Sequence, residues 1–141
     1  MTVVQVRWYG PYGLENINTR DIASYMGVYA IYSVFGGKES LLYIGKTSRS
    51  FNRRINEHYR EWLWNVRGEI KIRFGILEYP HGGIHSVKKL NDMESLLIHW
   101  HRPPYNTSSI EWYRGRLNLE VINVGRRGLL DRNVTTSVLT F

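Results

Sequence analysis

Five side chains in this 141-residue chain are of the types that phosphate and proton-transfer chemistry use. They are two phenols, Tyr29 and Tyr43, followed by Arg54, His58 and Glu94. A phenol or an imidazole can transfer or position a proton. The planar arginine fork binds a phosphate through two hydrogen bonds and stays charged at any working pH. A carboxylate can hold a divalent cation. The set is suited to phosphodiester chemistry if the fold brings its members together.

The two tyrosines lie in segments that are expected to pair as antiparallel strands. Residues 28–34 are rich in β-branched and aromatic side chains, Gly36-Gly37 supplies a turn, and residues 41–44 continue as a second strand. The result is a hairpin with a loop of several residues, which should bring Tyr29 and Tyr43 close to each other.

Arg54 and His58 are expected on one helix. Ser50 is a candidate N-cap, and apolar residues then recur at helical spacing until Gly68. Arg54 and His58 lie four residues apart beside this apolar stripe, so both side chains should point to the same side of the helix.

Glu94 is expected on a second helix. Residues 69–76 alternate polar with apolar side chains, which predicts a half-buried strand. The second helix should follow Ser86 as its cap and end before Pro103-Pro104. Glu94 would then lie at the border of the buried face of this helix.

The predicted fold class is α+β, with a small mixed or antiparallel sheet of about three core strands flanked by helices. Residues 1–141 are expected to form a single domain with its core at 25–108. An N-terminal extension, residues 1–24, should be irregular or a single strand. A C-terminal extension, residues 109–141, should form a β-hairpin from residues 117–122 and 134–139 around a basic loop that contains Arg126 and Arg127.

The composition favours a polyanionic partner. Nineteen Lys and Arg against twelve Asp and Glu give a formal net charge of +7. The absence of cysteine excludes disulfides, thiolate catalysis and cysteine-ligated zinc. No apolar run approaches the roughly 18 residues of a membrane span, and the N-terminus lacks the pattern of a signal peptide. An intracellular protein, cytoplasmic or nucleoid-associated and without a membrane partner, is expected.

The order of the motifs resembles the GIY-YIG nuclease superfamily. Gly27-Val28-Tyr29, Tyr43-Ile44-Gly45, Arg54 with His58, Glu94 and Asn106 follow one another as in that family, over about residues 25 to 108. The first motif has valine where the family name has isoleucine, which keeps a β-branched strand residue and leaves the tyrosine in place. The resemblance implies a metal-dependent DNA endonuclease that hydrolyses phosphodiester bonds with one Mg²⁺ or Mn²⁺ ion.

The resemblance also implies a role for each site residue. Glu94 would hold the metal, and Arg54 would bind the scissile phosphate. Tyr29 and Tyr43 would respectively activate and position the attacking water, while His58 would orient Tyr29 or relay its proton. A tyrosine titrates near 10, so an efficient base needs a lowered pKa. Arg54, the metal and neighbouring basic residues are expected to lower the pKa of Tyr29.

Further residues are expected to support the site or to bind DNA. Gly45 and Asn106 should be structural, with the Asn106 amide tying loop backbone near the tyrosines. Lys46 and Thr47 directly follow the second motif and could contact the DNA backbone. Basic residues elsewhere are candidates for a phosphate-binding surface: Arg53, Arg60, Lys88, Lys89, Arg114, Arg116, Arg126 and Arg127.

Two other classes of function are open. One is a catalytically silent nucleic-acid-binding module of the same fold, against which the complete set of five reactive side chains argues. The other is a protein-docking function of the aromatic N-terminus. Within the nuclease hypothesis, restriction-type, mobile-element and single-strand-specific enzymes all remain. A single site cuts one strand at a time, so a homodimer is expected if both strands of a duplex are cut.

Overall fold

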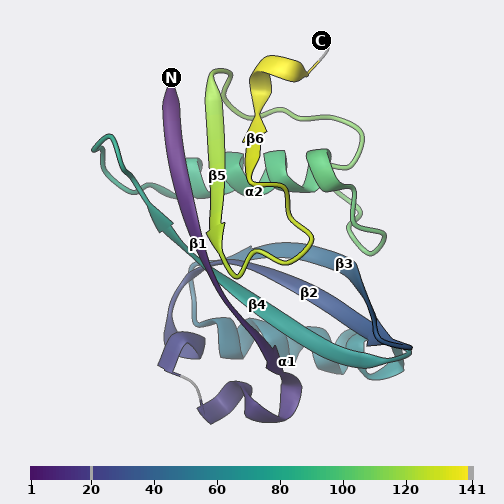
Figure 1. The fold of residues 1–141 in the computed structure, drawn as a ribbon. Coiled ribbons are helices and arrows are strands. Elements are labelled where there is room, and N and C mark those ends of the chain that lie inside the picture. Colours follow the sequence, from purple (N-terminus) through teal and green to yellow (C-terminus); the bar gives the residue numbers. More distant parts are fainter. Residues whose placement is uncertain (20, 140–141) are drawn as a thin grey trace.

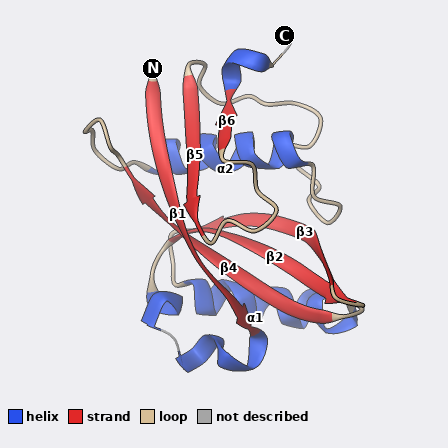
Figure 2. Cartoon of the chain, viewed as in Figure 1, coloured by secondary structure: helices blue, strands red, loops and turns tan. Residues whose placement is uncertain are grey.

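The computed structural model describes residues 1–19 and 21–139. Its six strands belong to one curled sheet with two α-helices (Figures 1 and 2), so the predicted α+β class is confirmed. The strands are β1 (Thr2–Gly13), β2 (Gly27–Phe35), β3 (Lys38–Thr47), β4 (Glu69–Glu78), β5 (Leu119–Gly125) and β6 (Asn133–Thr135). The α-helices are α1 (Phe51–Glu61) and α2 (Val87–His101), and short 3-10 helices span Leu14–Thr19, Asp21–Ser24, Leu63–Asn65 and Thr136–Val138.

The sheet order is β3-β2-β4-β1-β5-β6. Neighbouring strands are antiparallel except β1 and β5, which are parallel. The strands β2, β3 and β4 are the three predicted core strands. They carry the tyrosines and lie at one end of the sheet order, with β3 at the free edge.

The two helices cover opposite faces of the sheet because side chains alternate along each strand. On β2, Val28 and Ala30 belong to the core cluster that includes Leu90 and Met93 of α2. Tyr29, between them, belongs to the cluster that includes Phe51 and Ile55 of α1. Within the described residues no helix is long and apolar enough to cross a membrane.

A β-bulge in β3 determines which way Tyr43 faces. Ile31 pairs with Tyr43 but Tyr32 pairs with Leu41, so Leu42 is an extra residue in β3. As a result Leu42 and Tyr43 both pack on the α1 side, whereas Ile44 packs on the α2 side. The bulge therefore places the Tyr43 ring on the same face as Tyr29.

Both predicted N-caps are present. The side chain of Ser50 accepts a hydrogen bond from Arg53 N, and that of Ser86 accepts one from Lys89 N. α1 ends at Glu61, earlier than the expected stop at Gly68, and a 3-10 helix follows it. α2 ends at His101, before the two prolines, as predicted.

The extensions are part of the sheet. β1 is a twelve-residue strand between β4 and β5, and it runs from beside α2 to beside α1 (Figure 1). At the C-terminus β5 and β6 pair as the predicted hairpin, but β6 has only three residues. Residues 136–138 form a 3-10 helix instead of strand because the Thr135 side chain accepts a hydrogen bond from Ser137 N and caps a turn.

Candidate active site

The tyrosines of the two motifs lie side by side in the β2–β3 hairpin, toward its open end and away from its turn. Their ring centroids are 6.2 Å apart at an interplanar angle of 26°. Tyr29 is fully buried and Tyr43 is half-buried. Tyr29 pairs with Gly45 on β3, and a Cβ atom at position 45 would collide with the Tyr29 hydroxyl. The glycine therefore leaves the space that the phenol occupies.

His58 on α1 is hydrogen-bonded through both ring nitrogens. Its Nε2 lies 2.6 Å from the Tyr29 hydroxyl, and its Nδ1 lies 2.9 Å from Trp62 Nε1. An indole N–H can only donate, so Nδ1 must be an unprotonated acceptor. Burial, with the Arg54 charge, lowers the pKa of His58 to about 4, so the ring is neutral at pH 7. Its single proton is therefore on Nε2, and His58 donates to the Tyr29 oxygen.

Arg54 precedes His58 by one helical turn and is held by Glu57. Arg54 Nη1 donates to Glu57 Oε1 at 3.0 Å, and Arg49 donates to both carboxylate oxygens at 2.9 and 2.8 Å. Hydrogen bonds from Arg49 and then Arg54 lower the pKa of Glu57 to about 2, so it stays ionised. One carboxylate thus positions two guanidinium groups, each of which has five N–H donors in total.

Glu94 approaches from α2, on the other face of the sheet. Its side chain is 14% exposed, and its Oε1 lies 3.7 Å from Lys46 Nζ on β3. Burial raises the pKa of Glu94, while Lys46 and Arg54 lower it in part. One turn earlier on α2, Asn91 Oδ1 is buried and has no hydrogen-bond partner among the described residues. Residues three apart on a helix are neighbours, so a carboxylate and an unpaired carbonyl oxygen lie together.

Some of these side chains line a pocket of about 210 Å³, which we call the Lys46 pocket. Arg54 of α1, Asn91 of α2 and Lys46 of β3 all line it, so it lies where the two helices approach the edge strand. Its other lining residues are Thr47, Ser48, Arg49, Val87 and Leu90. Because three of the lining side chains are cationic, the pocket is suited to an anion.

Asn106 fastens the chain after α2 to the free edge of β3. Its Oδ1 accepts a hydrogen bond from Ile44 N at 3.0 Å, and its Nδ2 donates to Ile44 O at 2.8 Å. The backbone N–H of Tyr105 donates to Leu42 O at 2.9 Å. These bonds flank Tyr43, and they fix the part of β3 from which its ring projects.

The electrostatics of the phenols differ from the expectation. Burial raises the pKa of Tyr29 above its ordinary value, Tyr43 raises it further, and Arg54 opposes the change. Burial also raises the pKa of Tyr43, against the effect of Arg54. For the residues of the chain itself, the expected lowering of the Tyr29 pKa is wrong, because desolvation of a buried phenolate outweighs the attraction of one guanidinium.

The segment of the chain that carries these site residues matches a known protein family. The family model of the GIY-YIG catalytic domain matches residues 25–106. The protein belongs to the GIY-YIG family. No significant match was found among curated proteins or among solved structures. Membership implies nuclease activity on a nucleic-acid substrate, and the family typically uses a divalent metal.

The candidate DNA-binding residues of this GIY-YIG protein fall into two groups. The first group is exposed: Arg53, Arg60, Arg114 and Arg126. The second group forms bonds within the chain. Lys88 pairs with Asp92 at 3.1 Å, Lys89 donates to Ile84 O at 2.7 Å, and Arg127 donates to Leu130 O at 2.8 Å.

Two further candidates also form bonds within the chain. Arg116 Nε donates to Asp92 Oδ2 at 2.9 Å. Thr47 is buried, and its Oγ1 accepts a hydrogen bond from Arg49 N at 2.9 Å. The Thr47 hydroxyl therefore holds the turn after β3, and its Lys46 neighbour is the side chain that reaches the pocket.

Sequence reasoning gave no role to three residues that contact or border the site. Trp62 lies four residues after His58, Glu57 lies three after Arg54, and Asn91 lies three before Glu94. Each spacing is that of side-chain neighbours on a helix. The spacing could have identified all three as neighbours of site residues, although the orientation of the Trp62 indole depends on the end of α1 at Glu61.

Proposed function

We propose that this protein is a metal-dependent DNA endonuclease that hydrolyses phosphodiester bonds with one Mg²⁺ or Mn²⁺ ion. The supporting observation is the convergence of its five reactive side chains at one edge of the sheet. Arg54 and Glu94 come from helices on opposite faces, yet both alter the pKa values of Tyr29 and Tyr43. His58 is bonded directly to Tyr29.

The Lys46 pocket is the proposed site of the scissile phosphate. Arg54 would bind a phosphoryl oxygen through its guanidinium fork, because Glu57 fixes the side chain and leaves it other donors. Lys46 and Arg49 add positive charge to the same pocket. Charge that builds on the phosphate during attack would therefore be offset by groups already in place.

His58 is proposed to orient Tyr29 and not to accept its proton. Its Nε2 already carries a proton, and its Nδ1 accepts from Trp62. Donors therefore point in one direction, from Trp62 through His58 to Tyr29. The Tyr43 ring stacks beside that of Tyr29, with the ring centroids 6.2 Å apart. Tyr43 is the half-exposed phenol of the pair, and we assign it the contact with the attacking water.

The oxygens of the site fit a hard cation. Glu94 provides one carboxylate, and Asn91 provides a buried carbonyl oxygen without a partner among the described residues. No cluster of three or more His, Asp or Glu side chains occurs in the described part of the chain. Mg²⁺ suits such a site because it retains several waters and needs only one or two carboxylates. When bound, it supplies charge neutralisation at the phosphate and a more acidic water.

The test is a cleavage assay with purified protein. Supercoiled plasmid and end-labelled single-stranded oligonucleotides are incubated with and without Mg²⁺, for the wild type and for Glu94→Gln. We expect cleavage only with the metal, and a rate at least ~10²-fold lower for the variant, because the amide loses the charge that holds the cation. DNA binding, measured by fluorescence anisotropy, should be nearly unchanged in the variant.

Two outcomes would contradict the proposal. A Glu94→Gln protein that cuts at the wild-type rate would remove the metal role from Glu94. A wild type that binds DNA but cuts neither substrate in Mg²⁺ or Mn²⁺ would favour the catalytically silent binding module.

A further inference from the structure

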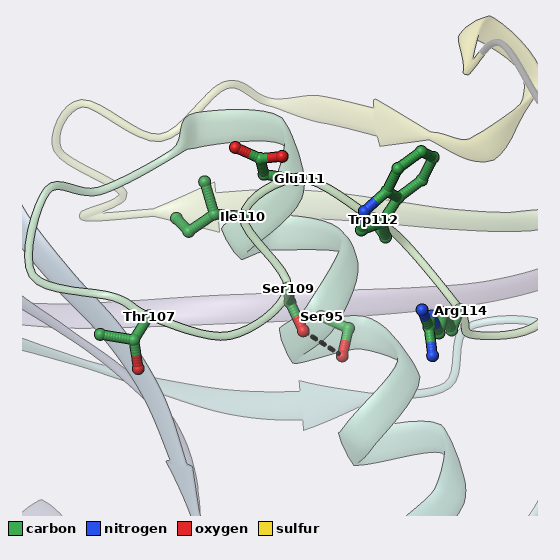
Figure 3. A pocket seen from close by; sticks show the side chains of 7 residues that line it. All are labelled: Ser95, Thr107, Ser109, Ile110, Glu111, Trp112 and Arg114. Carbon is green, nitrogen blue, oxygen red and sulfur yellow. Dashed lines mark hydrogen bonds between the residues drawn. The ribbon is translucent and has the colours of Figure 1, made fainter.

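A second pocket, of about 330 Å³, lies between α2 and the loop of residues 107–114 (Figure 3). We call it the Trp112 pocket. Figure 3 shows Ser95 of α2 and Ser109 of the loop against the helix, with the other lining side chains around them. The lining residues that matter here are Ser95, Thr107, Ser109, Glu111, Trp112 and Arg114.

The chemistry of this pocket differs from that of the Lys46 pocket. Trp112 is 71% exposed, and it is accompanied by one carboxylate, one guanidinium and three hydroxyls. The opposite charges of Glu111 and Arg114 offset each other, so the pocket should bind a free phosphate only weakly. An exposed aromatic ring offers a stacking surface that accepts any nucleobase. A carboxylate and hydroxyls can accept hydrogen bonds from the amino group of a base.

The loop is anchored while its tryptophan stays exposed. His99 Nδ1 lies 2.9 Å from Ile110 O, and Ser109 Oγ donates to Ser95 Oγ at 3.2 Å. Beyond Trp112, the Tyr113 side chain is buried and its hydroxyl donates to Arg116 O. The backbone on both sides of Trp112 is thus tied to the protein, and the indole is held in place before any ligand binds.

The pocket is adjacent to the proposed active site. Ser95 directly follows Glu94 on α2, and Thr107 directly follows Asn106, whose amide binds β3. Ser95 also lies four residues after Asn91, which lines the Lys46 pocket, so the two pockets border neighbouring positions of α2. Bases on one strand are spaced about 3.4 Å apart along the axis. A strand with a phosphate in the Lys46 pocket could therefore place a nearby base here.

We infer that the Trp112 pocket is a subsite for an unpaired nucleobase of the DNA strand that is cut, with a preference for bases that carry an amino group. This inference rests on the proposed function. Trp112 stacks on the base, Glu111 accepts a hydrogen bond from the amino group, and Arg114 contacts the adjoining phosphate. A base can stack on Trp112 only when it is not stacked within a duplex, so the substrate is single-stranded or locally unpaired.

The experiment measures binding of fluorescein-labelled oligo(dC) and oligo(dT) in metal-free buffer, so that no strand is cut. Wild type is compared with Trp112→Ala and with Trp64→Ala as the matched control, because Trp64 is also largely exposed, at 62%, but does not line this pocket. We expect Trp112→Ala to weaken oligo(dC) binding about 5- to 100-fold and to remove most of the quenching of intrinsic fluorescence, with Trp64→Ala near wild type. Glu111→Gln should reduce the preference for oligo(dC) over oligo(dT).

The outcomes separate this inference from the proposed function. If Trp112→Ala binds and quenches as the wild type does, or if Trp64→Ala loses as much affinity, the subsite is overturned and the nuclease proposal stands. If the wild type neither binds nor cuts any DNA, both are overturned. Thermal unfolding of the two alanine variants checks that any loss of binding is not a loss of folding.

Discussion

The indole of Trp62 determines which nitrogen of His58 carries the proton. Without a donor at Nδ1, the neutral imidazole could place its proton on either nitrogen, and one of the two forms would accept a hydrogen bond from Tyr29. With the Trp62 N–H 2.9 Å away, the form that donates to Tyr29 is favoured by one hydrogen bond. Such a bond contributes about 1 kcal/mol, enough to make one tautomer dominant.

We expect Trp62→Phe to lower the cleavage rate about tenfold, because the phenyl ring keeps the packing but donates nothing to Nδ1. Nitrogen-15 NMR of the His58 imidazole measures the tautomer directly. The wild type should show a protonated Nε2, and the variant a mixture of the two forms. A variant that retains a single Nε2-protonated ring would show that Trp62 does not select the tautomer.

Burial of Tyr29 predicts how the reaction responds to pH. The pKa of this phenol is raised from 10, so its phenolate is scarcer at every pH than that of a free tyrosine. An inflection in the pH–rate profile between about pH 6.5 and 9 therefore cannot be the ionisation of Tyr29. We expect Tyr29→Phe to be slower than the wild type, by about 10²-fold, with the same shape of pH–rate profile at saturating DNA and fixed Mg²⁺. Loss of the pH dependence in Tyr29→Phe would restore this tyrosine as the titrating base.

At the scale of elements, the β2–β3 hairpin sets the geometry of both phenols. The bulge at Leu42 turns Tyr43 to the α1 face, and the missing side chain of Gly45 gives room to Tyr29. Neither feature acts through a reactive group. Together they explain why the second motif requires a glycine two residues after its tyrosine.

Gly45→Ala tests this requirement. The added methyl group would displace the Tyr29 ring, so we expect a loss of about 1–3 kcal/mol in the free energy of unfolding and at least ~10²-fold in rate. The control is Gly37→Asn in the β2–β3 turn, where a Cβ meets nothing within 4 Å and where asparagine tolerates the positive φ of 79°. Urea unfolding and plasmid cleavage measure the two effects. Equal behaviour of both variants would show that the site does not need the space at Gly45.

Local sequence signals predicted the helices and strands well. The features that were not predicted depend on contacts between residues far apart in the sequence. The two serine caps, the strand predicted at 69–76 and the end of α2 each depend on residues within a few positions, which the sequence displays directly. The position of β1 in the sheet does not depend on nearby residues. Its partners are β4, about seventy residues later, and β5, more than a hundred residues later, and no local pattern specifies such pairings. The same limit hid the contact of Asn106 with Ile44, since only the folded chain shows which backbone the amide reaches.

At the scale of the whole molecule, the net charge of +7 predicts that binding to a nucleic acid weakens as the salt concentration rises. The basic loop after β5 allows one part of the proposed DNA-binding surface to be tested. Arg126 is exposed, whereas Arg127 donates to Leu130 O and supports the loop. Removal of Arg126 should therefore affect DNA binding, and removal of Arg127 should also affect stability.

We expect Arg126→Ala to reduce the slope of log Kd against log salt by about 0.9 on duplex DNA or 0.7 on single strands. Its thermal unfolding should match that of the wild type, while Arg127→Ala should melt earlier because the Leu130 carbonyl loses its donor. Anisotropy titrations at several salt concentrations give the slopes. An unchanged slope for Arg126→Ala would exclude this loop from the DNA-binding surface.

The amide of Asn106 does for β3 what a seventh strand would do. A neighbouring strand would exchange an N–H and a C=O bond with Ile44, and the Asn106 side chain makes both, while Tyr105 N–H occupies the Leu42 carbonyl. Unpaired strand edges are templates on which other chains add strands and aggregate. A side-chain amide cannot be extended into a further strand, so the sheet ends at β3. Asn106 thus occupies backbone groups of Ile44 that another protein chain could otherwise pair with.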